Sequence, residues 1–225
     1  MPTKTVLLTV KNVSKTYPLP GGEVLKDISF TLNSGEVAAL IGPSGAGKTT
    51  LFNILGGLDN KYEGTVIING KNIKEYNPIY YRRHIIGTIF QQFYLLPTIN
   101  ALENVAVPLW IQGIRRKKAL KQAKDMIKKV YMLKHKDKYP KELSGGQAQR
   151  IAVARALITS PKLILADEPT GNLDTKTGKR VVDLILKMVQ NQKDKAAIII
   201  THDPMVIEHI KKRIYIRDGK IIKIE

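Results

Sequence analysis

The segment from Gly42 to Thr49 constrains this chain more than any other. It reads Gly-Pro-Ser-Gly-Ala-Gly-Lys-Thr and matches the pattern G-x-x-x-x-G-K-[ST] at every fixed position. The apolar run 37–41 precedes it, and the stretch 50–55 after it is typical of a helix. Strand, loop and helix in this order form the setting that the pattern requires. A glycine-rich turn that merely packs closely is the alternative, and four matched positions in this setting argue against it.

The chemistry of this pattern is the capture of phosphate. Glycines let the backbone turn so that successive N–H groups point at one phosphate chain, at the positive end of a helix dipole. Lys48 would reach the β- and γ-phosphates of a nucleotide, and the hydroxyl of Thr49 would contact Mg²⁺. The expected nucleotide contacts in this loop are Gly42, Pro43, Ser44, Gly45, Ala46, Gly47, Lys48, Thr49 and Thr50.

The length and composition indicate a folded chain without cysteine chemistry. With 225 residues, 43% of them hydrophobic, it can form one substantial core or one core with a small subdomain. The absence of cysteine excludes disulfides, thiolate nucleophiles and cysteine metal sites. The N-terminus has no apolar stretch of signal-peptide length, and no segment approaches the ~18 apolar residues of a membrane span. We expect a soluble, cytoplasmic chain that reaches a membrane only through a partner.

The net charge of +18 raises the question of an anionic partner. Short basic clusters occur at 82–83, 115–118, 134–138 and 211–213, but aromatic and basic residues do not alternate as they do on surfaces that stack nucleobases. A solvated, lysine-rich surface is therefore favoured over a nucleic-acid site, and no specific nucleic acid is expected. The face of an anionic membrane would also tolerate this charge.

The pattern of apolar residues predicts β-structure on both sides of the phosphate loop. Alternating and β-branched residues indicate strands at 5–13, 27–32 and 64–69, and Asn69-Gly70 indicates a turn. Pro18, Pro20, Gly21 and Gly22 mark a loop between the first two strands. A further strand at 85–90 ends in Gln91-Gln92.

The second half of the chain changes from helical to mixed α/β character. Apolar residues recur at three- and four-residue spacing within 101–139, which predicts a helical subdomain. The predicted order after it is a helix from Ser144 to Leu157, a strand at 163–166, a helix around 181–189, a strand at 196–200, a short helix after Pro204, and a hairpin of 213–217 with 220–225.

The strand at 163–166 ends in two acids, Asp167 and Glu168. In a phosphate-loop protein an acid at such a strand end lies beside Mg²⁺, so Asp167 would orient the ion through its waters. Glu168 is placed to polarise the attacking water as a general base. Acids at strand ends are common, so the pair is strong evidence of a nucleotide site only in combination with the loop at Gly42.

The segment Leu143-Ser144-Gly145-Gly146-Gln147 adds a second possible anion site. Ser144 is a good N-cap, and the two glycines let backbone N–H groups face outward at a helix start. Together with the phosphate loop, the acid pair and His202, this segment resembles the signature of the ATP-binding cassette (ABC) family of ATPases. The resemblance covers nearly the whole chain. It implies a head-to-tail pair of domains, in which Ser144, Gly145, Gly146 and Gln147 of one chain cover the ATP held by the other.

The resemblance implies roles for four further residues. Tyr17 matches an aromatic residue that stacks on adenine, although a strand-end tyrosine packed on the core is the alternative. Gln91 matches a glutamine that contacts Mg²⁺ and water, with Gln92 as an ambiguous neighbour. Asp174 matches a loop that crosses the dimer interface. His202 follows a predicted strand in Thr-His-Asp and matches a histidine that binds the γ-phosphate. A lone histidine is more often structural, but a histidine after the expected strand, in Thr-His-Asp, is not a lone signal.

The resemblance also implies the fold, cofactors and partners. The expected fold is a phosphate-loop core with a mostly parallel sheet flanked by helices, an N-terminal antiparallel β subdomain and an inserted helical subdomain. The single domain 1–225 would divide into a core at 1–90 and 160–225 and a helical part at 91–159. ATP and Mg²⁺ would be bound by a homodimer, or a pseudo-dimer with a related ATPase, on the cytoplasmic face of transmembrane permease subunits. Ala46, Thr49 and Ala148 depart from the commonest pattern without removing a group that the chemistry needs.

The segments 167–174 and 90–97 look like those of the macrolide-export, lipoprotein-release and cell-division ATPases. This similarity implies export or mechanical work at the membrane. An ATPase of a division or signalling complex that moves no substrate remains the alternative. A chromosome or DNA-repair ATPase would need a long coiled coil between Thr49 and Ser144, but only 94 residues lie between them. A translation-factor ATPase normally carries two cassettes.

Overall fold

A six-stranded sheet forms the centre of the molecule. The computed structural model describes residues 5–18, 22–190 and 194–225, so Pro20 and Gly21 of the predicted loop lie outside the described residues. The strand order is β10-β9-β3-β8-β7-β6. Among the described strands of this sheet only β10 is antiparallel to its neighbour. The predicted, mostly parallel sheet is confirmed, with strands β3 (Val37–Ile41), β6 (Ile86–Ile89), β7 (Leu163–Asp167), β8 (Ala196–Ile200), β9 (Lys212–Arg217) and β10 (Lys220–Ile224).

A second, antiparallel sheet has the order β2-β1-β4-β5. It contains β1 (Val6–Tyr17), β2 (Gly22–Asn33), β4 (Glu63–Ile68) and β5 (Lys71–Asn72). The predicted end of the first strand at residue 13 was wrong, because β1 continues through Tyr17, which pairs with Gly22. The polar segment 14–16 does not predict a strand by itself, but backbone pairing with β2 keeps it in the strand. The predicted turn is confirmed: Asn69 and Gly70 have φ of 52° and 77°.

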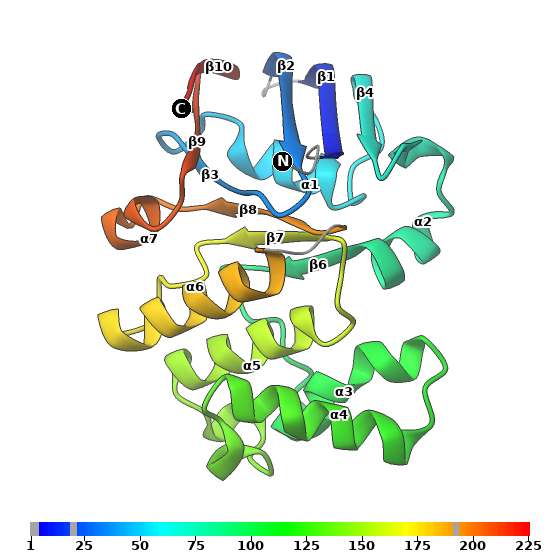
Figure 1. The fold of residues 1–225 in the computed structure, drawn as a ribbon, viewed down its shortest axis with the longest axis vertical. Coiled ribbons are helices and arrows are strands. Elements are labelled where there is room, and N and C mark those ends of the chain that lie inside the picture. Colours follow the sequence, from blue (N-terminus) through cyan, green and yellow to red (C-terminus); the bar gives the residue numbers. More distant parts are fainter. Residues whose placement is uncertain (1–4, 19–21, 191–193) are drawn as a thin grey trace.

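Helix α1 (Lys48–Leu55) lies between the two sheets (Figure 1). Its buried side chains are Leu51, Phe52, Ile54 and Leu55. They share one apolar cluster with residues of β1, β2 and β4 on one side and of β3, β7 and β8 on the other. Burial of apolar surface stabilises the fold by about 25 cal/mol per Å². This cluster is therefore the main support of the helix that carries Lys48.

Helices α3, α4, α5 and α6 lie on the opposite side of the six-stranded sheet from α1 (Figure 1). A second cluster joins buried residues of that sheet to α3, α4, α5 and α6. The predicted helical segment 101–139 is confirmed, and α4 buries Ala119, Ala123, Met126 and Ile127 as its spacing indicates. The bounds are α3 (Ala101–Ile111), α4 (Arg116–Lys129), η3 (Leu133–His135), η4 (Pro140–Glu142), α5 (Gly145–Leu157), α6 (Thr175–Val189) and α7 (Pro204–Glu208).

The segment between β5 and β6 was not anticipated. It contains η1 (Ile73–Glu75), α2 (Pro78–Tyr80) and a π-helical turn, η2 (Tyr81–Ile85). The side chain of Tyr81 is buried, and its hydroxyl donates to the carbonyl oxygen of Leu55 at 2.7 Å. Burial raises the pKa of Tyr81 far above its usual value. This segment therefore packs against the end of α1. Its helical turns have three to five residues each, which is too short to produce a helical pattern in the sequence.

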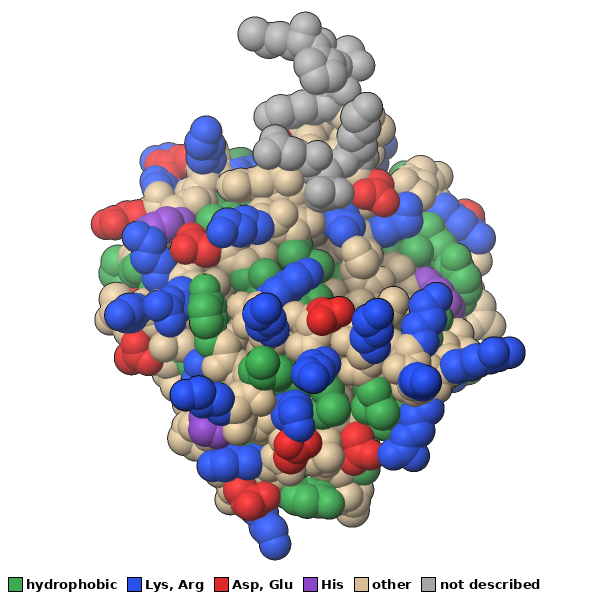
Figure 2. Space-filling model, turned by 60° about the horizontal axis from the view of Figure 1, so that its bottom comes forward, with side chains coloured by type: hydrophobic (Ala, Val, Ile, Leu, Met, Phe, Trp, Pro, Cys, Tyr) green, Lys and Arg blue, Asp and Glu red, His purple; other side chains and the backbone are tan. Residues whose placement is uncertain are grey.

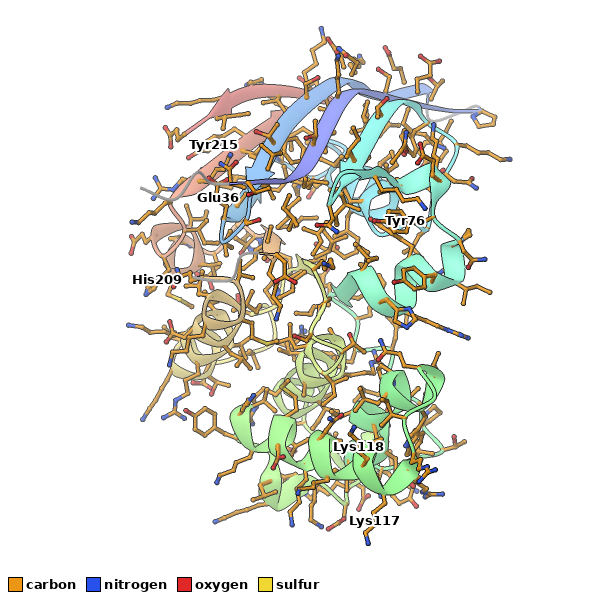
Figure 3. The ribbon with its side chains drawn as sticks, turned by 45° about the vertical axis from the view of Figure 1, so that its right-hand side comes forward. Glu36, Tyr76, Lys117, Lys118, His209 and Tyr215 are labelled. Atoms are coloured by element: carbon orange, nitrogen blue, oxygen red, sulfur yellow. The ribbon has the colours of Figure 1, made fainter. Side chains whose placement is uncertain are left out.

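The positive charge is concentrated at one end of the molecule. Residues 115–141 hold 12 of the 37 lysines and arginines and two of the 19 acids, so they contribute +10 of the net +18. Figure 2 shows Lys and Arg side chains spread over this end, and Figure 3 shows Lys117 and Lys118 pointing outward from α4. Within the described residues, no helix combines the length and apolar character needed to cross a membrane.

Candidate nucleotide site

The phosphate loop, residues 42–47, connects the carboxyl end of β3 to α1, as the sequence predicts. Gly47 has φ of 98°, and a Cβ there would lie 2.6 Å from Cδ2 of Leu25. A Cβ on Gly42 would lie 2.1 Å from the carbonyl oxygen of Ile216. Both positions therefore require glycine. No side chain caps the start of α1, so its first N–H groups are suited to binding an anion.

The ammonium group of Lys48 curls back over this loop. It donates hydrogen bonds to the carbonyl oxygens of Gly42 and Pro43, both at 2.7 Å. Thr49 and Thr50 follow in the first turn of α1, and Thr49 is exposed. A cation and a run of N–H groups thus face the same space.

Two acids and a histidine lie at the carboxyl ends of the neighbouring strands. A hydrogen bond of 2.7 Å joins Oε1 of Glu168 to Nδ1 of His202, whose side chain is 87% exposed. The hydroxyl of Thr201 lies 3.4 Å from Oε2 of Glu168. Glu168 adopts the left-handed conformation with φ of 46°, held by a hydrogen bond from its N–H to the carbonyl oxygen of Ile200. The glutamate is therefore oriented by β8.

Asp167 is the last residue of β7 and is partly buried. Burial raises the pKa of its carboxyl group, the neighbouring Glu168 raises it further, and Lys48 lowers it. The net effect is a raised pKa. The adjacent carboxylates of Asp167 and Glu168 favour a bound cation.

Ser144 caps the signature helix as the sequence predicts. Its hydroxyl accepts from the N–H of Gln147 at 3.3 Å, and Oε1 of Gln147 accepts from the N–H of Ser144 at 3.1 Å. Gly146 lies close to the loop before α6, because a Cβ there would be 3.0 Å from the carbonyl oxygen of Asn172. Asp174 caps α6 by accepting from the N–H of Thr177. The start of the signature helix and the loop that leads to Asp174 are therefore neighbours within one chain.

Tyr17 and Gln91 lie on other elements, at the end of β1 and just after β6. The hydroxyl of Tyr17 donates to Oδ2 of Asp59 at 3.1 Å, and its ring is half-buried. Gln91 and Gln92 are both exposed just after β6, so their geometry does not separate them. Among the described residues, no hydrogen bond or ion pair joins the Ser144 group to the Lys48 group. The structure brings Lys48, Asp167, Glu168 and His202 to one edge of the sheet.

The sequence analysis did not predict several polar residues that support these groups. Arg155 of α5 donates to the carbonyl oxygens of Tyr94 and Phe93 at 2.6 and 2.8 Å. Asn104 of α3 is fully buried and bonds to both backbone groups of Leu96. Both side chains hold the loop that follows Gln91.

The fold and the phosphate loop define a phosphate-loop ATPase with an inserted helical region. The sequence profile of the ABC transporter family matches residues 25–171. The chain is 40% identical over 225 residues to the macrolide export ATP-binding/permease protein MacB of Salmonella typhimurium, covering 97% of this chain and 34% of that protein. It is 39% identical over 221 residues to the lipoprotein-releasing system ATP-binding protein LolD of Syntrophus aciditrophicus, covering 96% of this chain and 99% of LolD.

The solved structures agree with these relatives. The dimeric post-hydrolysis state of the ATP-binding cassette MJ0796, bound to ADP and phosphate, has a TM-score of 0.89 and 36% identity, and covers 97% of this chain and 98% of that one. The chain belongs to the ABC transporter family, and it is an ATP-hydrolysing subunit of that family. The expected similarity to the macrolide-export and lipoprotein-release group is confirmed.

Proposed function

We propose that the chain is a transport motor in which Glu168 serves as the general base for ATP hydrolysis. This assignment rests on the position of the Glu168 carboxylate, which follows Asp167 in the chain. Its Oε1 is hydrogen-bonded to Nδ1 of His202 at 2.7 Å. Both acids stand at the carboxyl end of β7, where phosphate-loop folds bind ligands. A carboxylate oriented by a histidine and a hydroxyl is suited to holding a water molecule.

The reaction is an in-line displacement at the γ-phosphorus. The water oxygen bonds to phosphorus, the bond to the β-γ bridging oxygen breaks, and Glu168 accepts a proton of the water. Lys48 and His202 stabilise the charge on the phosphoryl oxygens. In this assignment Lys48 exchanges its hydrogen bonds to Gly42 and Pro43 for bonds to phosphate.

The residues present also suit Mg²⁺, for which Thr49, Asp167 and Gln91 offer the hard oxygen donors that this ion prefers. Burial raises the pKa of Asp167 and the neighbouring Glu168 raises it further, so a cation bound there would stabilise the charged carboxylates. No cluster of three or more His, Cys, Asp or Glu residues in the described ranges could hold a metal by itself. We infer that the ion enters with the nucleotide phosphates, whose charge it neutralises when bound.

A complete site requires a second ATPase chain. The signature residues 144–147 would cover the ATP of the partner, and Asp174 would lie at the interface. This proposal is supported by the exposure of Ser144 and Gly145 at a helix start and by the dimeric form of MJ0796. ATP then joins the two chains, and its hydrolysis separates them. The second chain is another copy or a related ATPase.

The motor would act on transmembrane permease subunits at the cytoplasmic face of the membrane. MacB, whose name includes both an ATP-binding part and a permease, supports this arrangement, and so does the lipoprotein-releasing LolD. The region from Gln91 to Val107 is the proposed docking site, because it joins the sheet to the helical part. Closure of the ATPase pair would drive the permease.

The test combines turnover with the size of the ATP-bound particle. Glu168→Gln should bind ATP, lose about 10²- to 10⁴-fold in turnover, and elute as a dimer only when ATP is present. Glu208→Gln changes an exposed glutamate of α7 and serves as the control. Wild-type turnover in Glu168→Gln would refute the general-base assignment, and monomeric hydrolysis by the wild type would refute the composite site.

Purification from the native membrane tests the transport assignment. The tagged chain should retain a multi-spanning membrane protein, and a transported substrate should stimulate turnover of that complex. A complex whose turnover responds to no exported compound, but to the assembly state of a division or signalling apparatus, would replace transport with the alternative function.

A further inference from the structure

A buried lysine lies beneath the ring of Tyr17. Lys15 and Tyr17 are two residues apart in β1, so their side chains share one face of the sheet. The side chain of Lys15 is only 5% exposed, and its ammonium nitrogen lies 4.5 Å from the centroid of the Tyr17 ring. A cation on one face of the ring leaves the opposite face for another group.

Asp59 binds both of these residues. Its carboxylate forms an ion pair with Lys15 at 2.7 Å and accepts a hydrogen bond from the Tyr17 hydroxyl at 3.1 Å. Lys15 also donates to the carbonyl oxygen of Lys61 at 2.5 Å. The ring, the ammonium group and the carboxylate therefore form one closed set of contacts. Each polar partner in it is satisfied, as a buried ion pair requires.

Asp59 connects this set to the helix of the phosphate loop. The carbonyl oxygen of Asn53 in α1 accepts hydrogen bonds from the N–H groups of Leu58 at 2.9 Å and Asp59 at 3.2 Å. Helix α1 begins at Lys48, directly after the phosphate loop. The position of the Tyr17 ring is thus coupled, through Asp59 and α1, to the element that would hold the phosphates.

We propose that Lys15 and Asp59 are positioning residues that hold the Tyr17 ring at a set place relative to the phosphate loop for contact with the nucleobase. The inference rests on the proposed contact between Tyr17 and adenine. Lys15 withdraws electron density from the ring by lying against its inner face, and it prevents the ring from sinking into the core. Asp59 fixes the position of the outer end of the ring by holding its hydroxyl.

The experiment separates base recognition from phosphate recognition. ATP and inorganic tripolyphosphate are titrated into the protein by calorimetry without divalent cations, so that no turnover occurs. Lys15→Met should weaken ATP binding roughly three- to thirtyfold, the range expected for a desolvated cation–π contact. Tripolyphosphate has no base, and its affinity should change less than about twofold in the same variant.

Two further variants guard against trivial explanations. Lys15→Met alone leaves Asp59 without its ion-pair partner, so the double variant Lys15→Met, Asp59→Asn removes both charges and restores neutrality. Lys74→Met is the matched control, because Lys74 lies 3.9 Å from the centroid of the Tyr62 ring in a similar lysine–tyrosine pair. This control should bind ATP like the wild type.

The outcomes distinguish the inference from the proposed base contact. In the Tyr17→Ala background, Lys15→Met should cost no further ATP affinity, because Lys15 acts through the ring. Equal losses for ATP and tripolyphosphate, an unchanged ATP affinity, or a full Lys15 effect without Tyr17 would each overturn the positioning role. If Tyr17→Ala itself leaves ATP affinity unchanged, the base contact is wrong and the role of Lys15 fails with it.

Discussion

Replacement of Arg155 by Met should weaken the attachment of the signature helix to the loop after Gln91. The guanidinium group of Arg155 donates to the carbonyl oxygens of Phe93 and Tyr94 at 2.8 and 2.6 Å. Hydrogen bonds from a charged donor contribute about 1.5–3 kcal/mol each. The carbonyl of Tyr94 can regain water because this residue is exposed, whereas Phe93 is half-buried. Burial lowers the pKa of Arg155, which shows a desolvation cost that the change removes.

These terms leave a net loss of about 2 kcal/mol in the free energy of unfolding, close to one charged hydrogen bond. For a chain of this size that loss corresponds to a fall of roughly 4–8 °C in the melting temperature. Thermal and urea unfolding, followed by circular dichroism, measure it. Arg155→Lys should recover part of the loss, since an ammonium group can reach one carbonyl but not both as a fork.

Arg150→Met is the matched control for Arg155, because Arg150 lies on the same helix and, among the described residues, its Nε donates a single hydrogen bond, to the carbonyl oxygen of Gly146 at 3.3 Å. Its loss should stay below about 1 kcal/mol. Arg155 joins the signature helix, which would cover the partner's ATP, to the loop after Gln91. At a temperature where Arg155→Met is folded, its turnover should therefore lose cooperativity in ATP. A variant with wild-type unfolding, or with lowered stability and unchanged cooperativity, would refute the reasoning.

Three further predictions concern the phosphates and the surface charge. Lys48→Ala should lower ATP affinity at least tenfold in calorimetry, and unaltered affinity would contradict the phosphate-loop assignment. Asp167→Asn should abolish Mg²⁺-dependent turnover. It should also raise the free energy of unfolding of the nucleotide-free protein by up to about 1 kcal/mol, because it removes a carboxylate whose pKa is raised. This gain should disappear at acid pH, where the carboxyl group of the wild type is protonated. Short DNA or RNA should not bind tightly at physiological salt, and tight, sequence-dependent retention would reopen the nucleic-acid hypothesis.

The strands and the phosphate loop were predictable because they depend on local chemistry. The run 37–41 is apolar throughout, as expected for a strand covered on both faces, and the pattern from Gly42 to Thr49 allows few backbone paths. The end of β1 was not predictable from its own residues. Polar residues such as Thr16 stay in the strand because β2 pairs with them, at Glu23 in this case.

The supporting contacts of the site were hidden for a different reason. Lys15 and Asp59 are separated by 44 residues, and Arg155 and Tyr94 by 61. A single side chain that meets a distant partner produces no periodicity, so a lysine buried beneath a ring resembles any lysine of a polar strand end. Residues with a motif were therefore found, whereas residues that only hold the motif in place were not.

The register of the central sheet explains why motifs far apart in the chain form one site. Leu40 of β3 and Asp167 of β7 both align with Ile200 of β8. All three strands are parallel, so the phosphate loop, Glu168 and His202 follow them at the same edge. The sequence places each motif directly after its strand, which predicts a common edge but not the order of the strands. A one-residue insertion in β8 would move His202 away from Glu168 and turn the following side chains to the other face. The geometry of the proposed base thus depends on sheet register more than on the conformation of any loop.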